Sequence, residues 1–468
     1  MSTASRFDVR LVAGVAAGKL SGQAIRLLGR GGGTAAPGLI ANLIEPNILD
    51  KLTGKVRGGR IVVAGTNGKT TTSRMLANIL DAADLQVIHN RSGSNLVRGI
   101  SAAFAAQSSW TGLPRGDIAV IESDEAAFPD IVRRVNPRLI LLLNLFRDQL
   151  DRYGELDTIA RHWRETFETL RPDQTLLVNG DDPALVAITE DLPAQRLLFG
   201  IKESRYLLPE LPHAVDSALC RRCGAPLRYT QLFLSHLGEY VCDNCGFHRP
   251  GLDFAASDIT LHGLDSVSLK LVHAEDVIDF SVAIPGLYNA YNAVAAASAA
   301  LTIGVAPRLV TKTLGAFRSA FGRIERLSYR GRELVIVLIK NPVGFDEVLR
   351  MLAVGGLREP TLIVINDLDA DGRDVSWLWD VNVEQLADGS SALYTSGIRG
   401  PDMAVRLKYA GIASERIHPL GDLPASFDQF VDAIPAGTTG YILPTYTAML
   451  QLRQMLVQRG TVAAFWEQ

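Results

Sequence analysis

The stretch "VVAGTNGKTTTSRML", residues 62–76, decides the fold. A short apolar segment leads into a glycine-bearing turn, and a lysine, three threonines and a helical pattern follow. Glycines allow a tight turn, backbone N–H groups then converge on an anion, and the next helix presents its positive end to that anion. The strict pattern G-x-x-x-x-G-K-[ST] fails, because its first glycine would be Val63. The shorter form still predicts a phosphate cradle.

This cradle predicts an ATP site with magnesium. Lys69 would offset the charge of the β- and γ-phosphates, and the Thr70 hydroxyl would bind Mg²⁺. Glu122 ends the apolar segment "DIAVIES", so it falls where α/β sheets bind ligands and is the second candidate magnesium ligand. The alternative for Glu122 is a solvated loop carboxylate. The expected ATP-binding residues of the loop are Gly65, Thr66, Asn67, Gly68, Lys69, Thr70 and Thr71.

Composition sets the class of protein. The 468 residues suggest about three domains, and 47% apolar with 21% charged residues is ordinary for a globular enzyme. The net charge of −3 gives no electrostatic reason to expect nucleic acid as a partner. The basic N-terminal segment 1–55 has no apolar run long enough for a signal peptide. We expect a surface helix there; the alternative is a helix that rests near a membrane surface.

Apolar segments alternate with helical patterns from residue 56 onward. This alternation is typical of an α/β fold with a parallel sheet covered on both faces. We expect an ATP-binding central domain over 56–324, interrupted by a cysteine-bearing insertion at 216–250. A smaller Rossmann-like α/β domain should follow at 325–468. The strand candidates of the central domain are "RIVVAG", "LQVIHN", "DIAVIES", "RLILLLN", "QTLLVNG" and "RLLFG".

All four cysteines lie in that insertion, as the pairs Cys220/Cys223 and Cys242/Cys245. Two C-x-x-C knuckles are typical of a tetrahedral zinc ribbon. Four thiolates leave no open position on the ion, so we expect structural zinc. Disulfides are the alternative, but a chain without an export signal should reside in a reducing, cytoplasmic compartment.

Further motifs occur in order along the chain. These are "NLFRDQLDRYGE" from Asn144, "VNGDDP" from Val178, "LYNAYNAVAA" from Leu287 and "FGRIER" from Phe321. Together with the cradle they resemble the Mur ligase family, the ATP-dependent amide-forming enzymes of peptidoglycan synthesis. The resemblance implies that Asn289, Asn292 and Arg323 lie near the nucleotide.

The departures from this family are informative. Gln149 replaces a histidine that helps to bind a metal in the amino-acid-adding members, and no lysine occurs between Arg147 and Lys202 to be carbamylated. The D-x-x-H-N-P motif appears as residues 337–342, with Lys340 in place of the histidine. Lys340 contacts phosphate or is a surface lysine; both interpretations stay open. The motifs that bind ATP in this family are therefore kept, whereas the residues that serve the incoming amino acid are altered.

The zinc ribbon and "NDLDADGRDVSWLWD", residues 366–380, narrow the resemblance to an amidating branch of the family. The resemblance implies amidation of the D-glutamate α-carboxylate in the lipid II stem peptide, at the inner face of the plasma membrane. Ammonia would come from a GatD-type glutaminase subunit in a heterodimer, and an aspartate would orient the histidine of that partner. The match assigns this catalytic role to Asp374. For Asp367 and Asp369 we favour a solvated acidic loop. A calcium site is the other interpretation, but the spacing of the aspartates does not match an EF-hand loop.

With its cysteines assigned to zinc, the chain has no thiol left to hydrolyse glutamine. If it amidates with glutamine nitrogen, another chain must therefore supply the ammonia. Two other functions stay open at this point. One is a ligase that adds an amino acid, as classical Mur and folylpolyglutamate enzymes do, and the other is a nucleic-acid-binding ATPase with a zinc ribbon.

Overall fold

The computed structural model describes residues 8–27, 35–90, 95–146, 156–211, 217–318, 324–353 and 358–462. Two residues singled out above, Gln149 and Arg323, lie outside the described residues.

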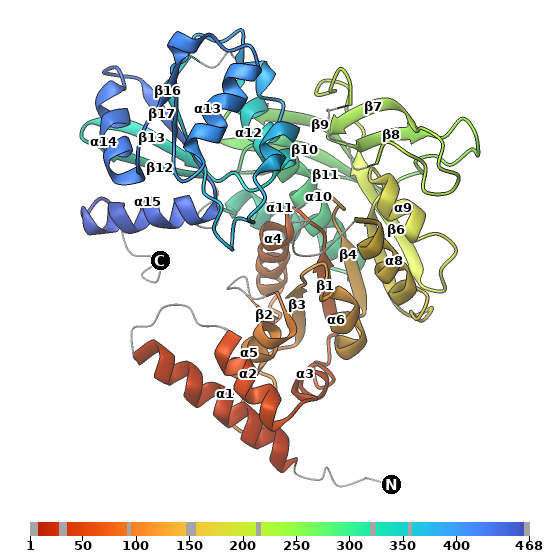
Figure 1. Ribbon diagram of the computed structural model, residues 1–468. Helices are drawn as coiled ribbons and strands as arrows, with labels where there is room; N and C mark the ends of the chain where they lie inside the picture. Colours follow the sequence, from red (N-terminus) through yellow and green to blue (C-terminus); the bar gives the residue numbers. More distant parts are fainter. Residues whose placement is uncertain are drawn as a thin grey trace, which may run out of the picture.

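A nine-stranded sheet forms the centre of the molecule (Figure 1). Its strand order is β11-β10-β9-β6-β5-β4-β1-β3-β2. All pairings from β2 to β9 are parallel, and β9, β10 and β11 pair antiparallel. The expected parallel sheet is confirmed. The bounds are β1 Arg60–Ala64, β2 Val87–His89, β3 Ile118–Glu122, β4 Leu139–Leu142, β5 Thr175–Asn179, β6 Gln195–Ile201, β9 Phe254–His262, β10 Ser266–His273 and β11 Asp276–Val282.

Helices cover both faces of this sheet, because its central strands are apolar on both sides. One core cluster joins the sheet to α4 (Lys69–Ala82), α10 (Leu287–Thr302) and α11 (Pro307–Ala316). A second cluster lies on the other face. Its helices include α3 (Ile48–Thr53), α5 (Val97–Ala106), α6 (Phe128–Val135), α8 (Leu156–Phe167) and α9 (Pro183–Ile188).

Three helices form the N-terminal part of the structure. The expected helix is α1 (Val9–Leu27), and α2 (Ala35–Ile44) packs against both α1 and α5. With α3 they lie at the end of the molecule away from the C-terminal sheet (Figure 1). Within the described ranges, no helix is both long and apolar enough to span a bilayer.

The cysteine-bearing insertion lies between β6 and β9. It contains a two-stranded antiparallel sheet of β7 (Arg228–Leu234) and β8 (Leu237–Val241).

A second sheet, of six strands, begins at residue 324. Its order is β12-β13-β17-β14-β15-β16, and only the β12–β13 pair is antiparallel. Helices α12 and α13 cover one face, and α14 and α15 cover the other. The bounds are β12 Ile324–Tyr329, β13 Arg332–Val337, α12 Pro342–Ala353, β14 Thr361–Val364, η1 Ser376–Asp380, η2 Val383–Leu386, β15 Leu393–Ser396, α13 Gly400–Tyr409, η3 Ser414–Arg416, β16 Ile417–Pro419, α14 Leu423–Ala433, β17 Thr439–Pro444 and α15 Tyr446–Gln458.

Candidate active site

The phosphate loop connects β1 to α4 and needs its two glycines. Gly65 and Gly68 have φ angles of 141° and 88°, which side chains rarely adopt. A Cβ on Gly65 would lie 2.9 Å from the backbone nitrogen of Asn144, and one on Gly68 would clash with the Asn292 side chain. The loop is therefore held tightly between the β4 end and α10.

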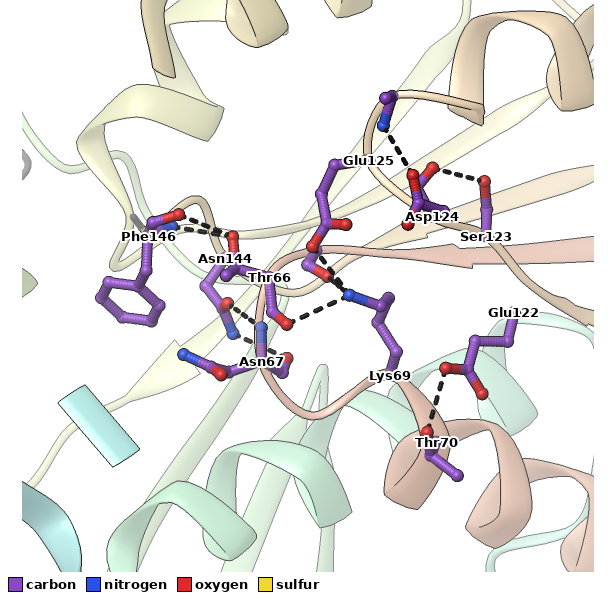
Figure 2. Close-up of polar contacts among 12 residues, drawn as sticks. Thr66, Asn67, Lys69, Thr70, Glu122, Ser123, Asp124, Glu125, Asn144 and Phe146 are labelled. Carbon is purple, nitrogen blue, oxygen red and sulfur yellow. Dashed lines mark hydrogen bonds and ion pairs between the residues drawn. The ribbon is translucent and has the colours of Figure 1, made fainter. Parts of the chain in front are cut away.

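Lys69 is buried at the start of α4. Its Nζ donates to the carbonyls of Gly65, at 2.7 Å, and Thr66, at 3.1 Å, and forms an ion pair with Glu125 Oε1 at 2.7 Å (Figure 2). The lysine expected to meet phosphate charge is thus held by a carboxylate to which sequence analysis gave no role. The paired arrangement keeps a buried cation compensated.

Thr70 and Glu122 meet beside the loop. The Thr70 hydroxyl donates to Glu122 Oε1 at 2.9 Å (Figure 2). Pairing of β1 with β3 sets Val63 opposite Glu122, which brings the strand end to the loop. The Asn90 side chain then fixes the Glu122 backbone through two hydrogen bonds of 2.9 Å. A hydroxyl and a carboxylate side by side form an oxygen donor set that suits Mg²⁺.

An asparagine clamp steadies the other end of the loop. Asn144 Oδ1 accepts from the Asn67 N–H at 2.8 Å, and its Nδ2 donates to the Asn67 carbonyl at 3.1 Å. The Thr66 hydroxyl donates to the Phe146 carbonyl at 2.9 Å (Figure 2). These hydrogen bonds hold the backbone of the loop in place.

The two expected asparagines of α10 lie against the same loop. Asn292 Nδ2 donates to Asn289 Oδ1 at 3.0 Å, and Asn292 Oδ1 accepts from the Thr72 hydroxyl at 3.3 Å. Asn341, which directly precedes α12 in the C-terminal part, donates from its Nδ2 to Asn67 Oδ1 at 2.9 Å. Three separate parts of the chain therefore meet at the loop.

A cavity of about 130 Å³ opens beside Asn67 and Gly68. It is about ten times the roughly 10–15 Å³ that a cavity needs to hold one water molecule. Exposed Lys340 is among the residues that line it.

The cysteines gather into one cluster, in which all four sulfur atoms lie within 4.8 Å of one another. Two of the Sγ–Sγ distances are 3.6 Å for Cys220–Cys245 and 3.5 Å for Cys223–Cys242. Disulfide sulfurs lie about 2.05 Å apart, so these are not bonded pairs. Zinc–sulfur bonds of about 2.3 Å in a tetrahedron would separate the sulfurs by about 3.8 Å. The four thiols therefore fit a zinc ion.

The carboxylates of the acidic segment after β14 differ in their partners. Asp367 pairs with Arg399 at 2.8 Å, Asp369 pairs with Arg373 at 2.7 Å, and Asp371 accepts from the Thr447 N–H at 2.8 Å.

Asp374, which is exposed like Asp369, accepts from the Ser376 N–H at 2.8 Å. That hydrogen bond, together with the Ser376 side chain, holds the pKa of the Asp374 carboxyl below its usual value. Asp374 thus presents a charged carboxylate on the surface of the C-terminal part.

Two family models match this chain. The Mur ligase middle domain matches residues 63–217, and the MurT ligase C-terminal model matches residues 338–449. "Lipid II isoglutaminyl synthase (glutamine-hydrolyzing) subunit MurT" of Streptococcus pneumoniae is 33% identical, over 97% of this chain and 99% of its own length. The chain belongs to the MurT family. The MurT subunit of Staphylococcus aureus strain COL is 31% identical, over 94% of this chain and 96% of its own.

Solved structures agree with the fold. A pseudomurein peptide ligase type C from Methanothermus fervidus superposes with a TM-score of 0.67 at 22% identity, covering 90% of this MurT-family chain and 84% of its own. MurF from Acinetobacter baumannii gives 0.62 at 17% identity, with coverages of 90% and 80%. MurF from Thermotoga maritima, solved in complex with ADP, gives 0.58 at 16% identity, with coverages of 88% and 83%. The expected Mur ligase-like fold is confirmed.

The structure brings the sequence-predicted loop residues together with Glu122, Asn289 and Asn292. Asp374 lies in the C-terminal part, in the segment between β14 and η1, and the cysteines lie in the insertion. Sequence analysis missed the contacts of Glu125, Asn144 and Asn341. Asn144 opens a motif that was noticed, but no local pattern shows which strand end it faces.

Proposed function

We propose that this MurT-family chain is the ATP-dependent ligase subunit of a two-chain amidotransferase. Its substrate is the α-carboxylate of D-glutamate in the lipid II stem peptide, and the product is D-isoglutamine. The observation that carries the proposal is the preorganised phosphate cradle in a chain whose thiols are all gathered in one cluster.

The ATP phosphates would lie on the loop from Gly65 to Thr71. Lys69 would exchange the carboxylate of Glu125 for phosphate oxygens, since both offer negative charge at hydrogen-bonding distance. Thr70 and Glu122 would hold Mg²⁺, which offsets phosphate charge when bound. Positioning and charge stabilisation are the main contributions of such sites to phosphoryl transfer.

The reaction has two steps. A carboxylate oxygen of D-glutamate attacks the γ-phosphorus, the bond to the ADP oxygen breaks, and an acyl phosphate forms. Ammonia then attacks the acyl carbon, phosphate leaves, and the nitrogen loses a proton to give the amide.

The ammonia source is a second chain in this proposal. Glutamine hydrolysis needs an activated nucleophile such as a cysteine, and Cys220, Cys223, Cys242 and Cys245 fit the zinc site instead. A GatD-type glutaminase would form a heterodimer with this chain, with Asp374 facing its histidine.

One experiment tests the proposal. The chain is incubated with ATP and lipid II, with or without a GatD-type glutaminase, and with glutamine, ammonium or free amino acids; mass spectrometry identifies the product. With ammonium, we expect the chain to amidate lipid II by itself. With glutamine, we expect amidation only when the glutaminase is present. Attachment of an amino acid would instead make the chain a classical Mur-type ligase.

A further inference from the structure

The inserted hairpin reaches the cavity beside the phosphate loop. Strands β7 and β8 are joined by the turn Ser235–His236, and the paired residues Leu234 and Leu237 line the cavity. Both leucines are buried. They belong to the same core cluster as α4 and α10, whereas Cys242, at the other end of the hairpin, packs into the core on the opposite face.

The turn is connected to the phosphate loop through buried rings. The His236 ring is fully buried, its centroid lies 4.6 Å from that of Phe146, and its Nε2 lies 3.5 Å from Asp182 Oδ2. The Phe146 N–H in turn donates to the Thr66 hydroxyl at 3.0 Å. A displacement of the hairpin tip would therefore disturb groups that contact the loop.

The C-terminal part holds the same hairpin. Arg350 on α12 donates to the Phe233 carbonyl at 2.8 Å and to the Tyr206 carbonyl at 2.6 Å. From the same helix, Val343 and Val348 line the cavity. The hairpin thus sets how α12 lies over the cavity.

The lining of the cavity has the chemistry of a nucleoside site. Apolar side chains, among them Leu234 and Leu237, lie with the amide groups of Asn67, Asn292 and Asn341. Flat bases bind between apolar surfaces while a few polar groups fix their edges. Because Gly68 of the phosphate loop also lines the cavity, a nucleoside there would be adjacent to phosphates on the loop.

We propose that the tip of the β7–β8 hairpin forms a wall of the nucleoside pocket, and that the cysteine cluster keeps this wall in place. The nature of the nucleotide rests on the function proposed above. An isolated two-stranded hairpin is only marginally stable in water. Cys242 follows β8 directly and Cys223 precedes β7, so a metal on the cluster closes the open end of the hairpin.

The test compares two leucines of the same strand in the full-length chain. Leu234→Ala removes a side chain from the cavity wall, whereas Leu232→Ala removes an equally buried side chain that does not line it. Equilibrium binding is measured for a non-hydrolysable ATP analogue with Mg²⁺ and for inorganic tripolyphosphate. We expect Leu234→Ala to lower the affinity for the ATP analogue about tenfold, because one buried apolar contact is lost. The affinity of Leu234→Ala for tripolyphosphate should stay unchanged. Leu232→Ala should bind both the ATP analogue and tripolyphosphate as the unmodified chain does.

A second variant tests the cysteine cluster. Cys245→Ser should lower the zinc content and weaken the analogue while tripolyphosphate still binds, which also shows that the loop is folded. The hairpin proposal is wrong if Leu234→Ala binds the ATP analogue as tightly as the unmodified chain does. It is also wrong if either variant loses affinity for the analogue and for tripolyphosphate equally. If the unmodified chain binds neither ligand, the function proposed above fails instead.

Discussion

At the scale of single residues, the candidate site pairs the Lys69 ammonium group with the Glu125 carboxylate. Lys69 is buried, and a buried charge without a partner is costly. Glu125 compensates it at 2.7 Å, and the Gly65 and Thr66 carbonyls accept further hydrogen bonds from the Lys69 Nζ. An incoming phosphate would replace one anion by another, so the loop need not rearrange to bind it.

Replacing Lys69 by alanine should lower amidation with added ammonium by roughly 10²–10³, because preorganised charge at a transferring group contributes about that much. Steady-state rates of the full-length chain measure this. The variant also removes the ion pair of the buried Glu125 carboxylate with Lys69, so some loss of stability is expected.

The double variant Lys69→Ala, Glu125→Gln separates the two effects. It also removes the charge of the buried Glu125 carboxylate and should recover thermal stability while turnover stays low. A rate near that of the unmodified chain in the single variant would show that phosphate chemistry occurs elsewhere.

At the scale of structural elements, the two-stranded insertion depends on its cysteines. Binding free energy at structural zinc sites contributes directly to folding. The two turns that present the thiols are closed by backbone hydrogen bonds, Gly224 N–H to Cys220 at 2.8 Å and Gly246 N–H to Cys242 at 2.9 Å. Such geometry places the thiols for one ion.

We predict one zinc ion per chain in protein purified without chelator, as measured by elemental analysis. Chelation should lower the unfolding temperature. Clearly less than one equivalent of zinc in folded, active protein would contradict the assignment.

Glu203 ties the segment after β6 to β9. The Arg205 guanidinium and the N–H groups of Arg205, Ser204 and Ile259 lower the pKa of the Glu203 carboxyl from 4.5 to about 2. Because the pKa is lower in the folded state, this stabilisation is present above pH 4.5 and is lost as the pH falls toward 2.

Glu203→Gln should cost about 1–2 kcal/mol at pH 7, a value reduced for the solvent exposure of Arg205. The difference from the unmodified chain should shrink as the pH falls from about 5 to 3. Urea unfolding at several pH values measures it. A difference that is constant with pH would mean that Glu203 acts through packing and not through its charge.

At the scale of the whole molecule, the two sheets carry different tasks in our proposal. The nine-stranded sheet carries the phosphate loop, and the six-stranded sheet carries the exposed carboxylate of Asp374. Neighbouring Asp367 and Asp369 are paired with arginines. Asp374 is therefore the better candidate to act on a second chain.

Asp374→Asn keeps the size of the side chain and removes its charge. A triad acid orients and stabilises its histidine, and losing it costs up to about 10⁴ in rate in the serine-protease example. Glutamine-dependent amidation by the complex should therefore collapse, together with glutaminase activity. Amidation from added ammonium should survive, since that route bypasses the partner.

Asp369→Asn is the matched control, because it removes a charge from the same segment and should leave both routes largely unchanged. Equal loss of both routes in Asp374→Asn would place Asp374 in the ligase site or the fold. Loss of neither would make the segment a solvated acidic loop.

The amino-acid sequence by itself determined the elements with strong local signals. Continuous apolar segments predicted the strands of the parallel sheet, the turn from Gly65 to Thr70 predicted the cradle, and paired C-x-x-C knuckles predicted the cysteine cluster. The edge strands β12 and β16 were missed, because few of their residues are buried.

Only the tertiary structure decided which of these parts meet. Sequence analysis treated the cysteine insertion as a separate structural module, yet its Leu234 and Leu237 line the cavity beside the phosphate loop. Likewise, 56 residues separate Glu125 from Lys69, and 274 separate Asn341 from Asn67. Local patterns report whether a segment is buried and how it is shaped. The partner of a buried side chain depends on strand order and helix packing across the whole chain, and no local window of sequence contains that information.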